Sequence, residues 1–120
     1  MTSKALYYLT PTARRHLREA KAWSIARWGT QLTEEYFHAL DTAANDLAKN
    51  WKTYRSREEL SGGTGLLLCP VREHYLIYEP INGHQIVIVA VLRQSMDIPS
   101  ILNKGKHVIV RELEAFRKRK

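Results

Sequence analysis

The chain has 120 residues, of which 44% are hydrophobic and 26% charged, a composition typical of one soluble globular domain. No segment approaches the roughly 20 apolar residues of a membrane helix, and residues 1–20 lack the features of a secretory signal. We therefore expect a cytoplasmic protein without membrane contact. The single cysteine, Cys69, excludes an internal disulfide and fits a reducing compartment.

The net charge of +7 is concentrated at the C-terminal end. Residues 1–103 hold 12 basic and 10 acidic residues, whereas residues 104–120 hold seven basic residues against two acidic ones. This contrast predicts a nearly neutral domain, residues 1–103, followed by a basic tail, residues 104–120. Such a tail can attract nucleic acid or an acidic protein, and the alternative is a tail that only aids solubility.

The first half of the chain predicts one strand and two helices. Residues 5–9 are apolar and aromatic and predict a strand. Thr10 and Pro11 form an N-cap and first-turn pair, so a helix begins there and ends at Gly29. Its apolar residues are near helical spacing, except that Trp23 and Ile25 do not fit one narrow stripe.

A second helix is expected from Thr30 to about Asn50. Leu32, Tyr36 and Leu40 belong to its apolar stripe. Because the connection between the two helices is so short, we expect them to pack as an antiparallel hairpin.

The second half predicts three strands and a C-terminal helix. After a polar loop with one helical turn near residues 57–60, strands are expected at 65–70, 73–79 and 85–93. Asn82 and Gly83 predict a type I′ hairpin turn between the last two. Residues 96–102 suggest a short turn or helical cap. Residues 107–120 can form an amphipathic helix that docks its Ile109, Leu113 and Phe116 on the domain, or that stays mobile until a partner binds.

This order of elements predicts an α+β fold. An N-terminal strand precedes a two-helix hairpin, which lies across one face of a small antiparallel sheet with a C-terminal β-hairpin. A basic helix or tail follows.

Several segments, taken together in this order, resemble the RelE/ParE superfamily of toxins from type II toxin–antitoxin systems. No single segment is specific, but the set spans residues 6–102. The segments are "LTPTARRHLREA", "WG", "EEYFHAL", "REEL", "HYLIYEPINGHQIVIVAVLRQSMD" and "IPSIL". The Trp-Gly helix end and the final hairpin are more similar to the ParE branch.

The resemblance implies two activities that differ in kind. A ParE-like toxin inhibits DNA gyrase by binding it, and a cognate antitoxin neutralises the toxin in a hetero-oligomer. A RelE-like toxin instead cuts messenger RNA on the ribosome. An inactive family member, bound to its antitoxin, is a third possibility, because one fold can host all three. We expect the ParE-like function, with the ribosome and messenger RNA as the alternative target.

The resemblance also directs attention to the arginine that ends the most apolar strand, Arg93. A rim arginine on a rigid strand is a well-held cationic contact for a target or an antitoxin. The simpler alternative is an exposed ion pair with Asp97 or Glu79, without function. The full set of candidate contacts is Arg93, Arg72, Tyr75, Arg55, Arg57, Arg117 and Lys118.

For a nuclease, the candidate catalytic residues are Arg93, Arg72 and His74, with Glu79 and His84 as further acid or base candidates. In an antiparallel sheet the arginines could gather at one edge. Residues 79–120 contain no tyrosine, however, so the C-terminal catalytic tyrosine of many RelE-like nucleases has no match. The lysines those nucleases often use on the sheet are also missing. These differences weaken the nuclease hypothesis.

The remaining aromatic and histidine residues predict packing more than chemistry. Tyr75 and Tyr78 are three residues apart, so they point to opposite faces of their strand, one in the core and the other on the open face. The tryptophans are expected to be packing residues. The histidines show no metal-ligand spacing, although His74 and His84 could meet across the hairpin; no metal or cofactor is expected.

Overall fold

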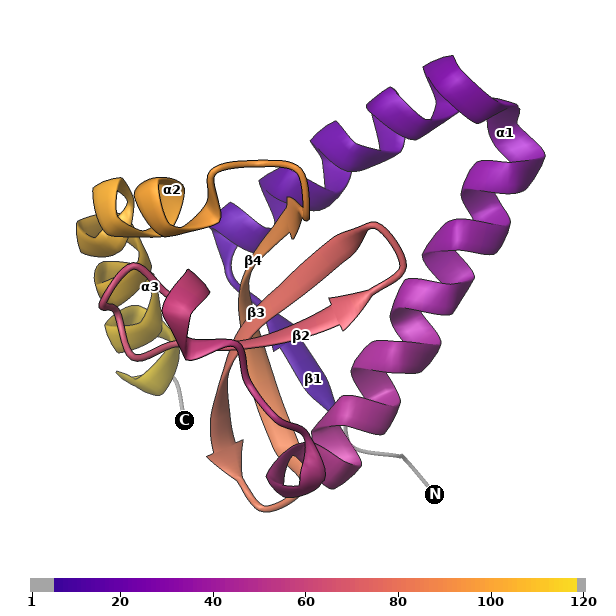
Figure 1. Cartoon of the computed structure of the whole chain (residues 1–120). Coiled ribbons are helices and arrows are strands. Elements are labelled where there is room, and N and C mark those ends of the chain that lie inside the picture. Colours follow the sequence, from indigo (N-terminus) through magenta and orange to yellow (C-terminus); the bar gives the residue numbers. More distant parts are fainter. Residues whose placement is uncertain (1–5, 119–120) are drawn as a thin grey trace.

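A computed structural model describes residues 6–118 as an α+β fold with one four-stranded sheet (Figure 1). The sheet order is β1-β4-β3-β2. Two short 3-10 turns, Trp51–Thr53 and Glu58–Leu60, follow the long helix. The strands and helices are β1 (Tyr7–Leu9), α1 (Pro11–Asn50), β2 (Leu67–Val71), β3 (His74–Asn82), β4 (Gln85–Arg93), α2 (Ile98–Lys104) and α3 (Lys106–Lys118).

Helix α1 begins and breaks at the residues that the sequence indicates. The Thr10 hydroxyl accepts a hydrogen bond from the backbone N–H of Ala13 at 3.2 Å, which satisfies one of the free donors of the first turn. Gly29 interrupts the helix with φ 85° and ψ 172°, a conformation essentially restricted to glycine. We call residues 11–28 the first arm and residues 30–50 the second arm.

The two arms diverge from Gly29 as an open V (Figure 1). They do not pack side by side along their lengths as the predicted antiparallel hairpin would; both arms instead contribute to one cluster on the same face of the sheet. The second arm buries Tyr36 and Leu40 as predicted, but Leu32, near the vertex, is 54% exposed. No helix in residues 6–118 is long and apolar enough to cross a membrane.

The sheet is mixed and not antiparallel throughout, which corrects the predicted topology. Strands β2, β3 and β4 are antiparallel neighbours, as expected. Strand β1, however, pairs in parallel with β4, with Tyr7 opposite Ile86. Local patterns could not indicate this pairing, because it joins segments 79 residues apart.

Both faces of the sheet are covered, so the prediction of one open face was wrong. Helix α1 packs on the face that contains Leu76, Tyr78 and Ile88. Helices α2 and α3 pack on the other face, which contains Tyr75 and Ile77. The two tyrosines do point to opposite faces, but both are buried, at 6% and 1% exposure.

Helix α3 is tied to the domain by apolar and polar contacts. Ile109 and Leu113 are buried in the core beneath the sheet. The Glu112 carboxylate accepts hydrogen bonds from the backbone N–H and the hydroxyl of Thr12, at 3.1 and 3.0 Å. The Phe116 ring lies 5.2 Å from that of Tyr8. Of the two predicted alternatives, the helix therefore docks; the division at residue 103 remains a prediction.

The hairpin between β3 and β4 turns one residue later than predicted. Asn82 pairs with Gln85, so Gly83 and His84 form the turn. Neither Asn82 nor Gly83 has a positive φ, which excludes the predicted type I′ turn. The Asn82 side chain holds the turn instead, because it accepts from the His84 N–H and donates to Gln85, both at 2.8 Å.

Candidate functional site

The candidate site lies where strand β4 ends, between the sheet and the first arm of α1. Arg93 is the last residue of β4, and its guanidinium carbon lies 4.6 Å from the centroid of the Trp23 ring. Arg27 approaches the same ring at 4.8 Å. A guanidinium at this distance is attracted by the electrons of an indole face. The strand therefore ends on an arginine that an aromatic ring positions.

A chain of aromatic rings connects Trp23 to the sheet. Trp23 contacts Trp28 edge-on at 5.4 Å, Trp28 contacts Tyr36 at 5.4 Å, and Tyr36 contacts the imidazole of His74 at 5.5 Å. These contacts bridge both arms of α1 and strand β3. They connect both arms of α1 to the end of the sheet and hold the Trp23 ring in position next to Arg93.

His74 is buried at 1% exposure and lies opposite Arg93 in the sheet register. The Tyr36 hydroxyl accepts from the Glu73 backbone N–H at 3.1 Å and lies 2.5 Å from His74 Nδ1. The Tyr36 hydroxyl can therefore donate its proton to Nδ1 when that nitrogen is unprotonated. Burial lowers the pKa of His74, and the charge of Arg93 lowers it further, while Glu73 acts in the opposite direction.

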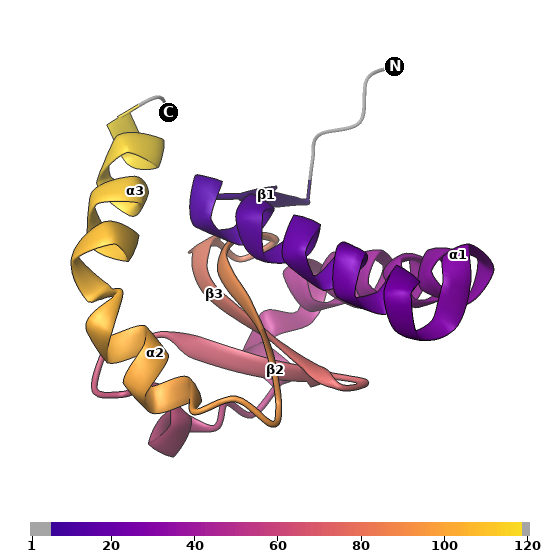
Figure 2. The same ribbon diagram turned by 90° about the horizontal axis from the view of Figure 1, so that it is seen from above.

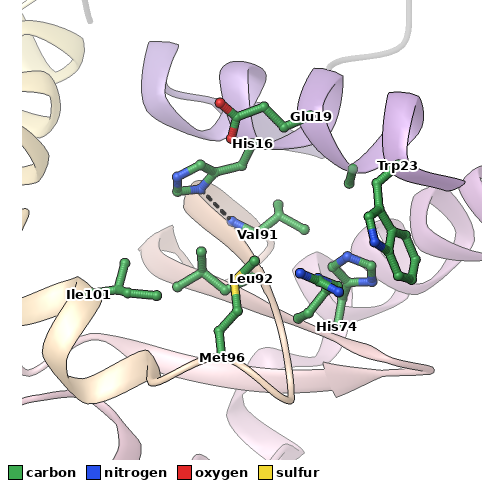
Figure 3. A pocket seen from close by; sticks show the side chains of 10 residues that line it. His16, Glu19, Trp23, His74, Val91, Leu92, Met96 and Ile101 are labelled. Carbon is green, nitrogen blue, oxygen red and sulfur yellow. Dashed lines mark hydrogen bonds between the residues drawn. The ribbon is translucent and has the colours of Figure 1, made fainter.

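A hollow of about 370 Å³ opens beside Arg93 (Figure 3). His16 and Trp23 line it from the first arm, and Met96 and Ile101 line it from beyond β4. The His16 Nδ1 accepts the backbone N–H of Val91 at 3.2 Å, which joins the first arm to β4 past the end of β1. Burial is the main cause that lowers the pKa of His16, followed by the charge of Arg15. The hollow thus has a largely apolar lining, with the cation of Arg93 and the carboxylate of Glu19 as its charged groups.

Arg72 lies at the same end of the sheet, in the tight turn between β2 and β3. Its φ of 53° is the one positive φ among the described non-glycine residues. Gln94 holds this turn against the end of β4, because its side chain donates to the carbonyl of Arg72 at 2.8 Å. The structure thus places Arg72, Arg93 and His74 at one end of the sheet, although Arg72 lines a different hollow from the one beside Arg93.

The other predicted arginines do not gather there. Arg57 pairs with Glu59 and donates to the Tyr75 hydroxyl at 3.3 Å, on the sheet face opposite α1. Arg55 is exposed in the loop before β2. The ring of Tyr75 belongs to the core, so only its hydroxyl side reaches Arg57.

The predicted contacts near the C-terminus lie far from Arg93 along the sheet. Arg117 pairs with Glu79, which sits toward the other end of β3 from His74. Lys118 is exposed at the end of α3. Since Glu79 engages Arg117, it does not form the suggested pair with Arg93. Within residues 6–118, Arg93 has no ion pair with Asp97 either.

The acid and base candidates are also separated. His84 lies in the hairpin turn and His74 at the far end of β3, so the suggested meeting of the two imidazoles does not occur. Among the described residues, no three His, Cys, Asp or Glu side chains are grouped to hold a metal ion. Sequence reasoning missed the roles of Trp23, Tyr36 and His16; the one signal was that Trp23 did not fit the apolar stripe of its helix.

Comparisons with known proteins now identify the fold and the family. A sequence model described as the ParE toxin of the type II toxin–antitoxin system, parDE, matches residues 7–98, which is most of the chain. The chain belongs to the ParE toxin family.

Individual members of the ParE family agree with this assignment. Toxin ParE1 of Mycobacterium tuberculosis, from strain CDC 1551 / Oshkosh and from strain H37Rv, is 33% identical over 92 residues, which cover 77% of this chain and 92% of the relative. A solved structure titled "Chromosomal ParDE TA system from P. aeruginosa" matches with a TM-score of 0.60 and 13% identity. The match covers 72% of this chain and 92% of that one, and it supports a ParE-like fold.

Proposed function

We propose that this ParE-family protein inhibits DNA gyrase by binding it in the cytoplasm, and that a cognate antitoxin neutralises it in a hetero-oligomer. The observation that carries the proposal is the cation held at the rim of the sheet. Arg93 is held over Trp23 and has no carboxylate partner in residues 6–118. Arginine and tryptophan are the residue types that contribute most to binding energy at protein interfaces.

The geometry favours binding over catalysis at this end of the sheet. A general base must reach its substrate and change its protonation state near the working pH. His74 is buried, its Nδ1 is occupied by the Tyr36 hydroxyl, and its pKa is lowered. Arg93 and the hollow beside it, by contrast, can bind a partner without catalysing a reaction.

The endoribonuclease hypothesis remains the second candidate, because Arg72, Arg93 and His74 do lie at one end of the sheet. In that case the two guanidinium groups would stabilise the charge of a phosphate transition state. The first hypothesis requires inhibition of gyrase without cleavage of messenger RNA, and the second requires cleavage of messenger RNA without inhibition of gyrase. One set of assays therefore separates them.

The test measures supercoiling of relaxed plasmid by gyrase with the purified full-length protein, with and without its antitoxin. We expect inhibition that the antitoxin relieves. Arg93→Ala should weaken inhibition at least tenfold, because a rim arginine of this kind contributes about 1.4 kcal/mol or more to an interface. Lys52→Ala is the matched control, since Lys52 also lies over an indole, that of Trp51 at 5.8 Å, but toward the other end of the molecule.

Thermal unfolding of both variants must first show an intact fold. Unimpaired supercoiling at a large excess of the toxin would contradict the proposal for that gyrase. Ribosome-dependent cleavage of messenger RNA, lost in Arg93→Ala and unchanged in Lys52→Ala, would then establish the second candidate.

A further inference from the structure

The two arms of helix α1 carry opposite charge. The first arm, residues 11–28, has five basic residues and one acidic residue. The second arm, residues 30–50, has one basic and four acidic residues. Because the arms diverge from Gly29, this contrast in sequence becomes a separation in space (Figure 1). One side of the molecule is therefore basic and another is acidic.

Four of the five cations of the first arm form one exposed group, and the fifth, Arg27, lies over the Trp23 ring. Arg14, Arg15, Arg18 and Lys21 are exposed, whereas Ala13 on the same arm is completely buried. We name these four exposed residues the basic surface. Among the described residues, just one of them has an ion pair, Arg15 with Glu19 at 4.0 Å. Both partners of that pair are mostly exposed, so the pair neutralises little.

Helix α3 extends the positive charge beside the start of the first arm. The Glu112 carboxylate binds Thr12, so this part of α3 lies against the first turn of α1 (Figure 2). Arg111, the neighbour of Glu112, is exposed. Glu112 is engaged by the helix start, so the exposed cations that flank this contact in sequence, Arg14, Arg15 and Arg111, outnumber the exposed carboxylate of Glu114.

The composition of the basic surface fits a phosphate backbone better than an acidic protein. Protein interfaces are built around a buried core of apolar and aromatic side chains. From residue 14 to residue 22, the first arm exposes no large apolar side chain. Interfaces with DNA are instead polar and strongly positive. The absence of an apolar centre thus argues against a protein partner here.

The dimensions also fit. Residues 14–21 extend about 10 Å along the helix axis, and duplex DNA carries one negative charge per about 1.7 Å of its axis. Several phosphates therefore lie within reach of this stretch. The acidic second arm would be repelled by the same duplex, which favours an approach from the side of the first arm.

We propose that the basic surface of the first arm binds the phosphate backbone of duplex DNA, without reading its bases. This interaction goes beyond the proposed inhibition of gyrase and is tested without gyrase. It places a second contact on the solvent side of the first arm, whose other side lines the hollow beside Arg93, so that DNA and a protein target can be held by different faces of this arm.

The experiment measures fluorescence anisotropy of a labelled 20-base-pair duplex with the full-length protein over a series of salt concentrations. The test variant is Arg14→Ala/Arg18→Ala. The control is Lys49→Ala/Lys52→Ala, which removes the same charge from exposed positions in the last turn of α1 and in the 3-10 turn that follows it. Circular dichroism and thermal unfolding check that both variants keep the fold.

We expect the test variant to bind about tenfold more weakly at low salt, and the control less than threefold. The slope of log affinity against log salt should fall by about 2 in the test variant, since each phosphate contact contributes about 0.9. Equal losses in both variants would show an effect of net charge alone and would overturn the proposal. The absence of duplex binding at low salt would overturn it as well, as would a test variant that keeps DNA affinity but loses affinity for an acidic protein.

Discussion

Arg93 shows how one residue can end a buried strand without an ion pair. Eight residues of β4 are buried in succession, and the ninth, Arg93, emerges at the rim. Among the described residues, no carboxylate forms an ion pair with Arg93. The Trp23 ring is its partner instead. An indole face stabilises a guanidinium while leaving its hydrogen-bond donors free. The donors of Arg93 are thus available to a ligand.

His16 has an equally specific role, because its imidazole accepts the N–H of Val91 only when Nδ1 is unprotonated. Glu19 and Glu112 raise its pKa, but burial and Arg15 outweigh them, so the pKa is lowered in the folded protein. The unfolded chain therefore binds a proton at His16 at a higher pH than the folded protein does. Stability from this group is present above about pH 6.5 and is lost as the pH falls through the lowered pKa.

We predict that His16→Gln flattens the pH dependence of stability between pH 7.5 and 5. Glutamine keeps an acceptor for the Val91 N–H but does not titrate. The free energy of unfolding, from urea titrations at each pH, should have a smaller slope in the variant; one proton corresponds to at most about 1.4 kcal/mol per pH unit. The control, exposed His38→Gln, should leave the slope as it is. An unchanged slope in His16→Gln would show that folding does not alter the pKa of His16, and would contradict the prediction.

At the scale of single elements, local sequence signals predicted some boundaries of helices and strands, whereas β2 and β3 each begin and end later than predicted. Thr10 with Pro11 starts α1, Gly29 breaks it, and β4 runs from Gln85 to Arg93 as expected. The hairpin turn was missed by one residue, because side-chain bonds of Asn82 stabilise a different turn. Local propensity could not reveal those bonds, which depend on Gln85 lying opposite.

The candidate site was predicted only in part, because local sequence signals can place some of its residues but not those brought in by tertiary packing. Arg93, Arg72 and His74 follow from the register of a hairpin, which is a local property. Trp23 and Tyr36 join the site only because the two arms of α1 diverge at a particular angle and meet the end of the sheet. That angle is set at Gly29 and by tertiary packing, so no pattern in the sequence specifies it.

We predict that Gly29→Ala destabilises the protein by about 1–3 kcal/mol, because φ 85° with ψ 172° is strained for any residue with a Cβ. The cost arises in the backbone, since an added Cβ would meet no heavy atom within 4 Å. Urea unfolding measures the change. Gly83→Ala, at a position without a positive φ, is the control and should change stability by less than about 0.5 kcal/mol. Equal stability of Gly29→Ala and the parent would mean that the arms can form one continuous helix.

At the scale of the whole molecule, the basic C-terminal segment is part of the packed structure. Ile109 and Leu113 are buried in the same cluster as Tyr75 and Ile77. Glu112 satisfies the free N–H of Thr12 at the start of α1, 100 residues away in sequence. Net charge alone suggested a detachable tail. The amphipathic spacing of Ile109, Leu113 and Phe116 was the better guide.

We predict that deletion of residues 104–120 lowers the melting temperature by at least about 10 °C or abolishes cooperative unfolding. The loss of two buried side chains costs about 1.5–3 kcal/mol each, a large share of the stability of a small domain. Thermal unfolding followed by circular dichroism measures this. Lys118→Ala, which alters charge on the exposed side of α3, should shift the melting temperature by less than about 2 °C. A truncated chain with the parent's melting temperature would show that α3 adds nothing to the core.

The parallel pairing of β1 with β4 also determines when the protein can fold. Thr10 and Val89, which hydrogen-bond at the junction of β1 and α1, are 79 residues apart. At about 5–20 residues per second, the ribosome needs roughly 4–16 s to synthesise that interval. Until then the N-terminal strand has no partner, and the end of β4 that carries Arg93 does not exist. A nascent chain of this toxin therefore has neither its rim arginine nor its complete four-stranded sheet until Arg93 has been synthesised.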